Sequence, residues 1–146
     1  MRPAWEVGTA AIAMIALALP AAACDCMTPP PVKEALRQSA AVFAAVAESV
    51  KVDFSPTNEF GAGPTAVKMR VTRSWKGPRA KTAVIVHTGM GGGDCGYPMR
   101  AGARYLVYAR RLGNGGLSTS ICSRTDSLPN ARPDSLELER RGRSAR

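Results

Sequence analysis

Alternation of apolar and polar residues, or a high content of β-branched residues, marks five segments of the chain. Both features are typical of β-strands, because successive side chains of a strand point to opposite faces. In residues 65–75, for example, Val67, Met69 and Val71 alternate with charged or polar residues. We predict strands at residues 42–52, 65–75, 82–88, 104–110 and 117–122, although the alanines of the first segment would also suit a helix.

Two short helices and several turn-rich connections complete this pattern. Residues 32–38 directly follow Pro31, which suits the start of a helix, and residues 135–141 predict a second helix. Glycine, proline and small polar residues mark connections at residues 55–64, 89–98 and 113–116. Together these elements predict a mainly β fold, a five-stranded Greek-key barrel of the OB type with short flanking helices. An immunoglobulin-like sandwich would need about seven strands.

The first 23 residues have the pattern of an export signal. Arg2 gives a positive start, residues 7–19 form an apolar run, and Ala21 and Ala23 form an A-x-A cleavage pattern before Cys24. The run is shorter than the about 20 residues that a membrane-spanning helix needs. We therefore expect residues 1–23 to be a signal peptide. The mature protein is expected to begin at Cys24, to be soluble without a transmembrane segment, and to be secreted or periplasmic.

The chain is strongly basic, with a formal net charge of +9. Such a charge can attract anionic membranes or nucleic acid, but it also provides solubility. An exported protein rarely meets nucleic acid, so we expect no nucleic-acid partner. We expect residues 24–139 to form one domain and the arginine-rich residues 140–146 to form a basic disordered tail.

All four cysteines, Cys24, Cys26, Cys95 and Cys122, belong to the predicted mature protein. An even number of cysteines in a short exported chain indicates disulfides. A bond between Cys24 and Cys26 would close a strained ring, so each is expected to pair with Cys95 or Cys122, in either combination. A zinc site made by all four cysteines is the alternative, but its ligand pairs are usually spaced C-x(2–4)-C.

The chain offers little that suits catalysis. His87 is the single histidine and lies inside a predicted strand, and no serine occupies a G-x-S-x-G turn. The glycine-rich residues 89–98 lack the lysine and the following helix of a phosphate-binding loop. We therefore predict that the protein is not an enzyme and has no cofactor and no metal of its own. The few carboxylates of the barrel region are scattered over different predicted elements: Asp25, Glu48, Asp53, Glu59 and Asp94.

Four motifs occur in an order that resembles a known family. They are CDC followed by prolines at the predicted mature start, WKG ending the second predicted strand, CGY before the fourth, and STSICS around the last cysteine. Over roughly residues 24–122, the chain is similar to the N-terminal domain of the tissue inhibitors of metalloproteinases, part of the netrin-like group. The resemblance implies an OB-fold barrel and the disulfides Cys24–Cys95 and Cys26–Cys122.

The resemblance also implies a mechanism. In these inhibitors, the α-amino nitrogen and carbonyl oxygen of the N-terminal cysteine chelate the catalytic zinc of a protease and displace its water. Transferred to this chain, that residue is Cys24, and the implied partner is a zinc metalloprotease. Asp25 stands where the family usually has a small hydroxyl residue, and this sequence shows neither the additional disulfide nor the second domain of the animal inhibitors. The implied inhibitory ridge comprises Cys24, Asp25, Cys26, Met27, Thr28, Asp94, Cys95 and Gly96.

Two other interpretations remain. The protein could be a non-inhibitory extracellular or envelope module that binds another protein through the same fold. Cys24 could instead be lipidated, as in bacterial lipoproteins, but those commonly carry leucine three residues before the cysteine, where this chain has Ala21. Lipidation would also leave Cys95 or Cys122 without a partner, so we expect Cys24 to form a disulfide.

Overall fold

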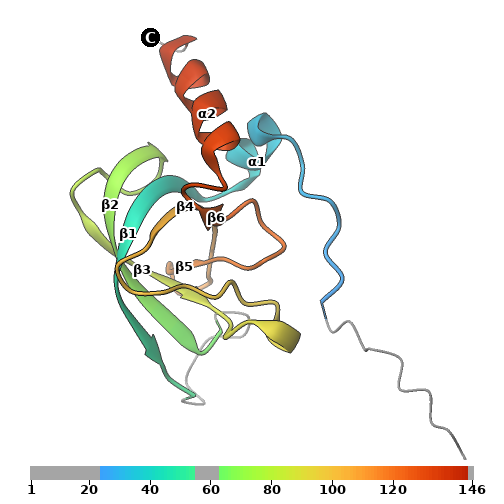
Figure 1. The fold of residues 1–146 in the computed structure, drawn as a ribbon, viewed down its shortest axis with the longest axis vertical. Coiled ribbons are helices and arrows are strands. Elements are labelled where there is room, and N and C mark those ends of the chain that lie inside the picture. Colours follow the sequence, from blue (N-terminus) through green and yellow to red (C-terminus); the bar gives the residue numbers. More distant parts are fainter. Residues whose placement is uncertain (1–23, 55–62, 145–146) are drawn as a thin grey trace, which may run out of the picture.

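The structure, a computed structural model, describes residues 24–54 and 63–144. The predicted signal peptide, residues 1–23, and residues 55–62 of the predicted turn lie outside the described residues, as do residues 145–146. Figure 1 shows the strands curled beneath the two helices. The elements in chain order are α1 (Val32–Gln38), β1 (Ala41–Val52), β2 (Thr65–Lys76), β3 (Ala83–Thr88), the 3₁₀-helix η1 (Gly92–Asp94), β4 (Arg104–Arg111), β5 (Leu117–Ser118), β6 (Asp126–Ser127) and α2 (Arg132–Ser144).

Five strands close into a barrel. The strand order is β1-β2-β3-β5-β4, and the pairing of β4 with β1 closes the ring. β3 and β5 are parallel, the other neighbours are antiparallel, and the short β6 pairs with β4. This confirms the predicted mainly β, five-stranded barrel with short flanking helices and two disulfides. The strand order is compatible with an OB-type Greek-key barrel.

Alternating residues of the long strands fill the inside of the barrel. On β2, Val67, Met69 and Val71 are buried, whereas Lys68 and Arg70 between them are exposed. The register of β1 with β2 shifts three times along the pair, and such irregularities bend a strand and increase its twist. This bending allows two strands of 12 residues to curl into a closed barrel.

β1 and β4 are buried on both faces where the helices cover them. Phe43 and Val107 belong to the core inside the barrel, while Val42, Leu106 and Tyr108 pack outside it, against the helices. This double burial explains the continuous apolar runs in these strands, in place of strict alternation. The other side of this second core is formed by Val32 and Ala35 of α1, Ala131 just before α2 and Leu138 of α2, and the two helices also contact each other.

The last predicted strand is shorter than we expected. β5 spans only Leu117–Ser118, and a turn begins at Ile121, after Thr119 and Ser120, which have no regular secondary structure. The Thr119 hydroxyl donates to the Tyr108 carbonyl over 3.0 Å, and the Cys122 amide donates to the Ser120 hydroxyl over 3.2 Å. Such side-chain hydrogen bonds to the backbone compete with a strand ladder. The predicted strand is therefore wrong beyond Ser118, and β6 was not predicted.

The second helix is longer than we expected. α2 spans Arg132–Ser144 in place of residues 135–141, so residues 140–144, assigned above to a disordered tail, are helical. Arg141 forms an ion pair with Glu137, four residues earlier, and such a pair stabilises a helix. The prediction of a disordered tail is thus wrong for residues 140–144, because the helix continues through them.

Candidate functional site

The N-terminal segment, residues 24–31, has no regular secondary structure. Figure 1 shows it, in blue, descending from α1 toward the loop that carries η1. Pro29, Pro30 and Pro31 keep its second half stiff, because proline fixes φ and has no amide hydrogen to donate. The Pro30 carbonyl accepts a hydrogen bond of 3.1 Å from Arg124, which ties the segment to the barrel.

Two disulfides attach the other half of the segment. Cys24 bonds to Cys95 and Cys26 bonds to Cys122, with Cα atoms 5.5 and 5.0 Å apart. This confirms the pairing that the resemblance implies. None of the four cysteines is free, so the alternative of a zinc site formed by their thiolates is wrong. The two disulfides indicate an oxidising environment of the extracellular or periplasmic kind.

The disulfides hold this segment without burying it. The side chains of Asp25, Met27 and Thr28 are exposed, and that of Met27 retains 89% of its accessible surface. Cys24 and Cys26, which alternate with them, are partly buried against the loops that they bond. The segment therefore presents a row of accessible side chains from a fixed backbone.

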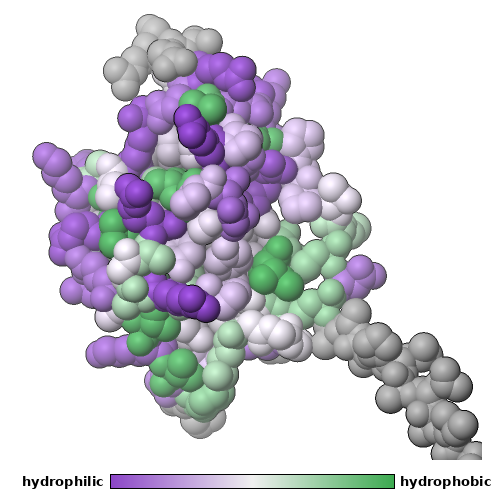
Figure 2. All heavy atoms as spheres, viewed as in Figure 1, coloured by the Kyte–Doolittle hydropathy of each residue, from purple (hydrophilic) through white to green (hydrophobic). Residues whose placement is uncertain are grey.

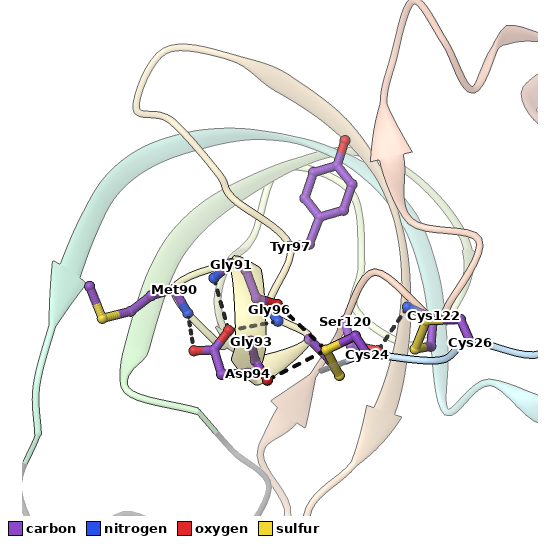
Figure 3. The surroundings of a disulfide bond; sticks show 12 residues. Cys24, Cys26, Met90, Gly91, Gly93, Asp94, Gly96, Tyr97, Ser120 and Cys122 are labelled. Carbon is purple, nitrogen blue, oxygen red and sulfur yellow. Dashed lines mark hydrogen bonds between the residues drawn. A yellow bond between two sulfur atoms is a disulfide. The ribbon is translucent and has the colours of Figure 1, made fainter. Parts of the chain in front are cut away.

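The Asp94 carboxylate organises the loop behind Cys24. It accepts hydrogen bonds from the backbone amides of Met90 at 2.6 Å, Gly91 at 2.9 Å and Gly96 at 3.0 Å (Figure 3). These bonds, led by that from Met90, hold the pKa of Asp94 below its ordinary value. Of the predicted ridge residues, Asp94 is thus committed to folding the loop, a role that its sequence position did not predict.

Close backbone contacts explain the glycines of this loop. A Cβ atom on Gly96 would lie 2.0 Å from the carbonyl carbon of Gly89, and one on Gly89 would lie 2.5 Å from the Asp94 carboxylate. Cys95 itself has a left-handed backbone, with φ of 57°, and its carbonyl accepts a 3.0 Å hydrogen bond from Ile121. The Cys24 sulfur lies 3.5 Å from the Gly92 carbonyl oxygen. The loop is therefore tightly fixed around the first disulfide.

The structure brings Cys24, Asp94, Cys95 and Gly96 together, and it places Cys26 at the neighbouring disulfide. Two exposed apolar residues beside them were missed by the sequence analysis. Met90, whose amide contacts Asp94, is 52% exposed, and Ile121, next to Cys122, is 40% exposed. Figure 2 shows apolar residues as separate spots on a surface that is otherwise largely hydrophilic. We define Met27, Met90 and Ile121 as the apolar rim of the site.

A partly buried polar network joins the segment to α2. Arg124 binds the two carboxylate oxygens of Asp134 at 2.7 and 2.6 Å, and the Tyr108 hydroxyl donates to the same carboxylate at 3.2 Å. Burial, followed by the negative charge of Asp134, raises the pKa of Tyr108, and Asp134 also raises the pKa of Arg124. Since Arg124 also binds Pro30, one guanidinium connects the segment, the barrel and the helix.

Of the residues considered for catalysis, Glu59 lies outside the described residues, and Glu48 forms ion pairs with Lys68 and Arg70. His87 is half-buried in β3, and its carbonyl accepts a hydrogen bond from Thr119. Tyr97 donates to Asp126 at 2.7 Å, and burial, followed by this bond, raises the pKa of Tyr97 to about 12. Among residues 24–54 and 63–144, no group of three or more histidine, cysteine, aspartate or glutamate side chains is placed to hold a metal ion. Within the same ranges, no helix is long and apolar enough to cross a membrane.

In comparisons with known proteins, no protein-family model and no curated protein matches this sequence.

Proposed function

We propose that the protein is an exported inhibitor of a zinc metalloprotease, similar in mode of action to the tissue inhibitors of metalloproteinases. The observation that carries the proposal is the Cys24–Cys95 disulfide, which fixes Cys24 against the Asp94 loop while the adjoining side chains stay exposed. In this proposal the protein acts by binding and has no catalytic activity of its own.

The chemistry of the proposed contact is that of a bidentate ligand. After cleavage before Cys24, its α-amine and its carbonyl would form a five-membered ring with the partner's zinc, which keeps one position open for water or substrate. An α-amine has an ordinary pKa of about 7.7–8.0, so part of it is neutral and able to bind metal near pH 7. The disulfide reduces the entropy lost on binding, because the segment is already ordered.

Asp25 determines the kind of protease that the proposal favours. By the resemblance, this side chain enters the primary specificity pocket of the protease. Placing an ionised carboxylate in an apolar pocket without a partner is strongly unfavourable, and the pocket would otherwise force the carboxylate to take up a proton. We therefore propose a target whose pocket contains a basic or hydrogen-bond-donating side chain.

The test compares three forms of the purified protein against a panel of zinc metalloproteases. The first begins at Cys24, the second retains one alanine before it, and the third carries one alanine after Arg146 as the matched control. We expect the first and third to inhibit, and the second to be weaker by at least roughly a hundredfold, since both zinc ligands are disturbed. Equal inhibition by all three would refute chelation by Cys24.

A second candidate is a binding module that does not inhibit. Met27 favours it, because this exposed apolar side chain, next to the Cys26–Cys122 disulfide, can contact a partner protein without any free amine. Binding of this kind would survive the alanine extension and would weaken on substitution of Met27. Lipidation of Cys24 has no such support, because the disulfide uses the sulfur atom that the lipid would need.

A further inference from the structure

β3 is paired along its whole length on one edge only. Its pairing with β2 runs from Ala83 to Thr88, whereas its pairing with β5 consists of Val86 with Leu117 and His87 with Ser118. In the described part of the chain, β5 therefore has no residue paired with the first half of β3, residues 83–85. The barrel closes through a short ladder and leaves a gap beside it, which we call the β3 seam.

The backbone of β3 presents hydrogen-bonding groups to this gap. The His87 carbonyl accepts a 2.9 Å hydrogen bond from Thr119, so His87 directs its backbone groups toward β5. Backbone groups alternate between the two edges of a strand, and Ala83 and Ile85 therefore face the same side as His87. An unpaired strand edge of this type is a template for another extended chain.

A hollow of about 450 Å³ lies at the β3 seam. Val84 and Leu117, which line it, are partly buried against the barrel core, and Ile85 at its margin is 56% exposed. On its other sides the hollow is bounded by the turn after β2, at Gly77 and Pro78, and by Arg111 at the end of β4. It has room for an apolar side chain beside the unpaired strand edge.

The surroundings of the hollow are basic. Arg79 and Lys81, in the turn that borders it, are exposed, and so is Arg111 in its wall. Among the described residues, none of these three forms an ion pair with a carboxylate, and no acidic residue lines the hollow. A second copy of this chain would bring the same cations together, whereas an acidic partner would neutralise them.

We propose that the β3 seam binds an extended, acidic segment of a partner protein, which adds as a short strand to residues 83–85. An apolar side chain of that segment fills the hollow, and its carboxylates bind Arg111 and Lys81. Cys24 is attached to the loop beyond the other end of β3, and five residue steps of about 3.3 Å separate Ala83 from Thr88. The seam is therefore distinct from the proposed inhibitory site and does not depend on it.

The test uses the whole mature protein and a blocked seven-residue peptide in which valine and glutamate alternate. We expect binding in calorimetry and slower hydrogen exchange at the Ala83 and Ile85 amides in NMR. The variant K81E/R111E should bind this peptide at least roughly tenfold more weakly, because two attractive charges become repulsive. The matched control is K51E/R100E, which makes the same change in charge at exposed positions in β1 and in the segment before β4. It should bind the peptide as tightly as the original protein does.

Two further peptides test the mode of binding. A copy with N-methylated backbone amides keeps the charges but cannot form the ladder, and a copy with lysine in place of glutamate reverses the charges; both should fail to bind. The proposal would be overturned if the N-methylated copy bound as tightly as the original peptide, or if the two double variants had equal effects. It would also be overturned if the original peptide did not bind, or if the protein self-associated through β3. One alanine before Cys24 should leave peptide binding unchanged, so the two proposals can fail separately.

Discussion

The two ends of the described chain are attached to the same barrel by different means. Residues 24–31 are held by two disulfides and keep four of their side chains exposed, whereas α2 is held by burying Leu138 completely in the outer core. Covalent attachment fixes a backbone and leaves its surface free. Attachment by burial covers the side chains that fix the element, so those side chains are not accessible to a partner. The N-terminal segment is thus the better placed of the two to meet a partner.

Arg124 and Asp134 are the point where the two ends depend on each other. Asp134 belongs to the first turn of α2, and Arg124 reaches from it to the Pro30 carbonyl of the N-terminal segment. Substitutions can weaken the disulfide attachment or the attachment of α2 separately, or can weaken both through the Arg124–Asp134 pair.

Removing the second disulfide should have the largest effect. Replacing both Cys26 and Cys122 by serine releases a link across 96 residues, which should lower the free energy of unfolding by about 4 kcal/mol. Chemical denaturation followed by circular dichroism measures the change. If the loss were below about 1 kcal/mol, packing and not the disulfide would hold the segment.

Truncating the buried face of α2 should have the next largest effect. Leu138→Ala leaves a cavity in the outer core and should cost about 3 kcal/mol in the same denaturation experiment. Leu136→Ala is the matched control, because Leu136 is 54% exposed and its loss should cost less than about 0.5 kcal/mol. Similar losses in the two variants would show that α2 is not held by burial.

Asp134→Asn should weaken both ends together. It removes the negative charge that Arg124 binds and should lower the free energy of unfolding by about 2 kcal/mol. This is less than for a fully buried pair, because both side chains are partly exposed. Glu137→Gln, which removes the partly exposed ion-pair partner of Arg141, should lower the free energy of unfolding by about 0.5 kcal/mol or less. NMR signals of residues 28–31 should shift in Asp134→Asn and stay in place in Glu137→Gln.

The smallest effect concerns the loop behind Cys24 and depends on pH. The folded-state pKa of Asp94 is lowered, so its stabilising contribution is fully present above the unfolded-state pKa of about 3.9 and is lost as the pH falls through the lower folded-state pKa. The melting temperature of Asp94→Asn should therefore lie below that of the original protein at pH 6, and the two melting temperatures should approach each other near pH 2. A constant difference between the two melting temperatures across this range would contradict the role of the carboxylate.

Periodic features of the fold could be predicted from sequence, and local hydrogen bonding could not. Alternation identified β2, because Val67, Met69 and Val71 share one buried face. The end of β5 was missed because the hydroxyl groups of Thr119 and Ser120 form hydrogen bonds with backbone groups that could otherwise join a strand ladder. The alternation of apolar and polar residues carries no signal of such bonds. The role of Asp94 was missed for the same reason, because its partners are the backbone amides of a loop whose conformation could not be predicted from the sequence.

The long disulfide links also affect the order of assembly. During synthesis, Cys24 and Cys26 emerge early, Cys95 follows much later, and Cys122 comes last, after β1 to β5 have been made. Cys95 is then the first distant thiol that either early cysteine can meet, and only one of the two choices is native. If Cys26 bonds to Cys95 first, the native pairing can form only after thiol–disulfide exchange, a process that takes seconds to hours and is accelerated by an isomerase. The yield of native protein should therefore depend on the redox catalysts of the compartment in which the chain folds.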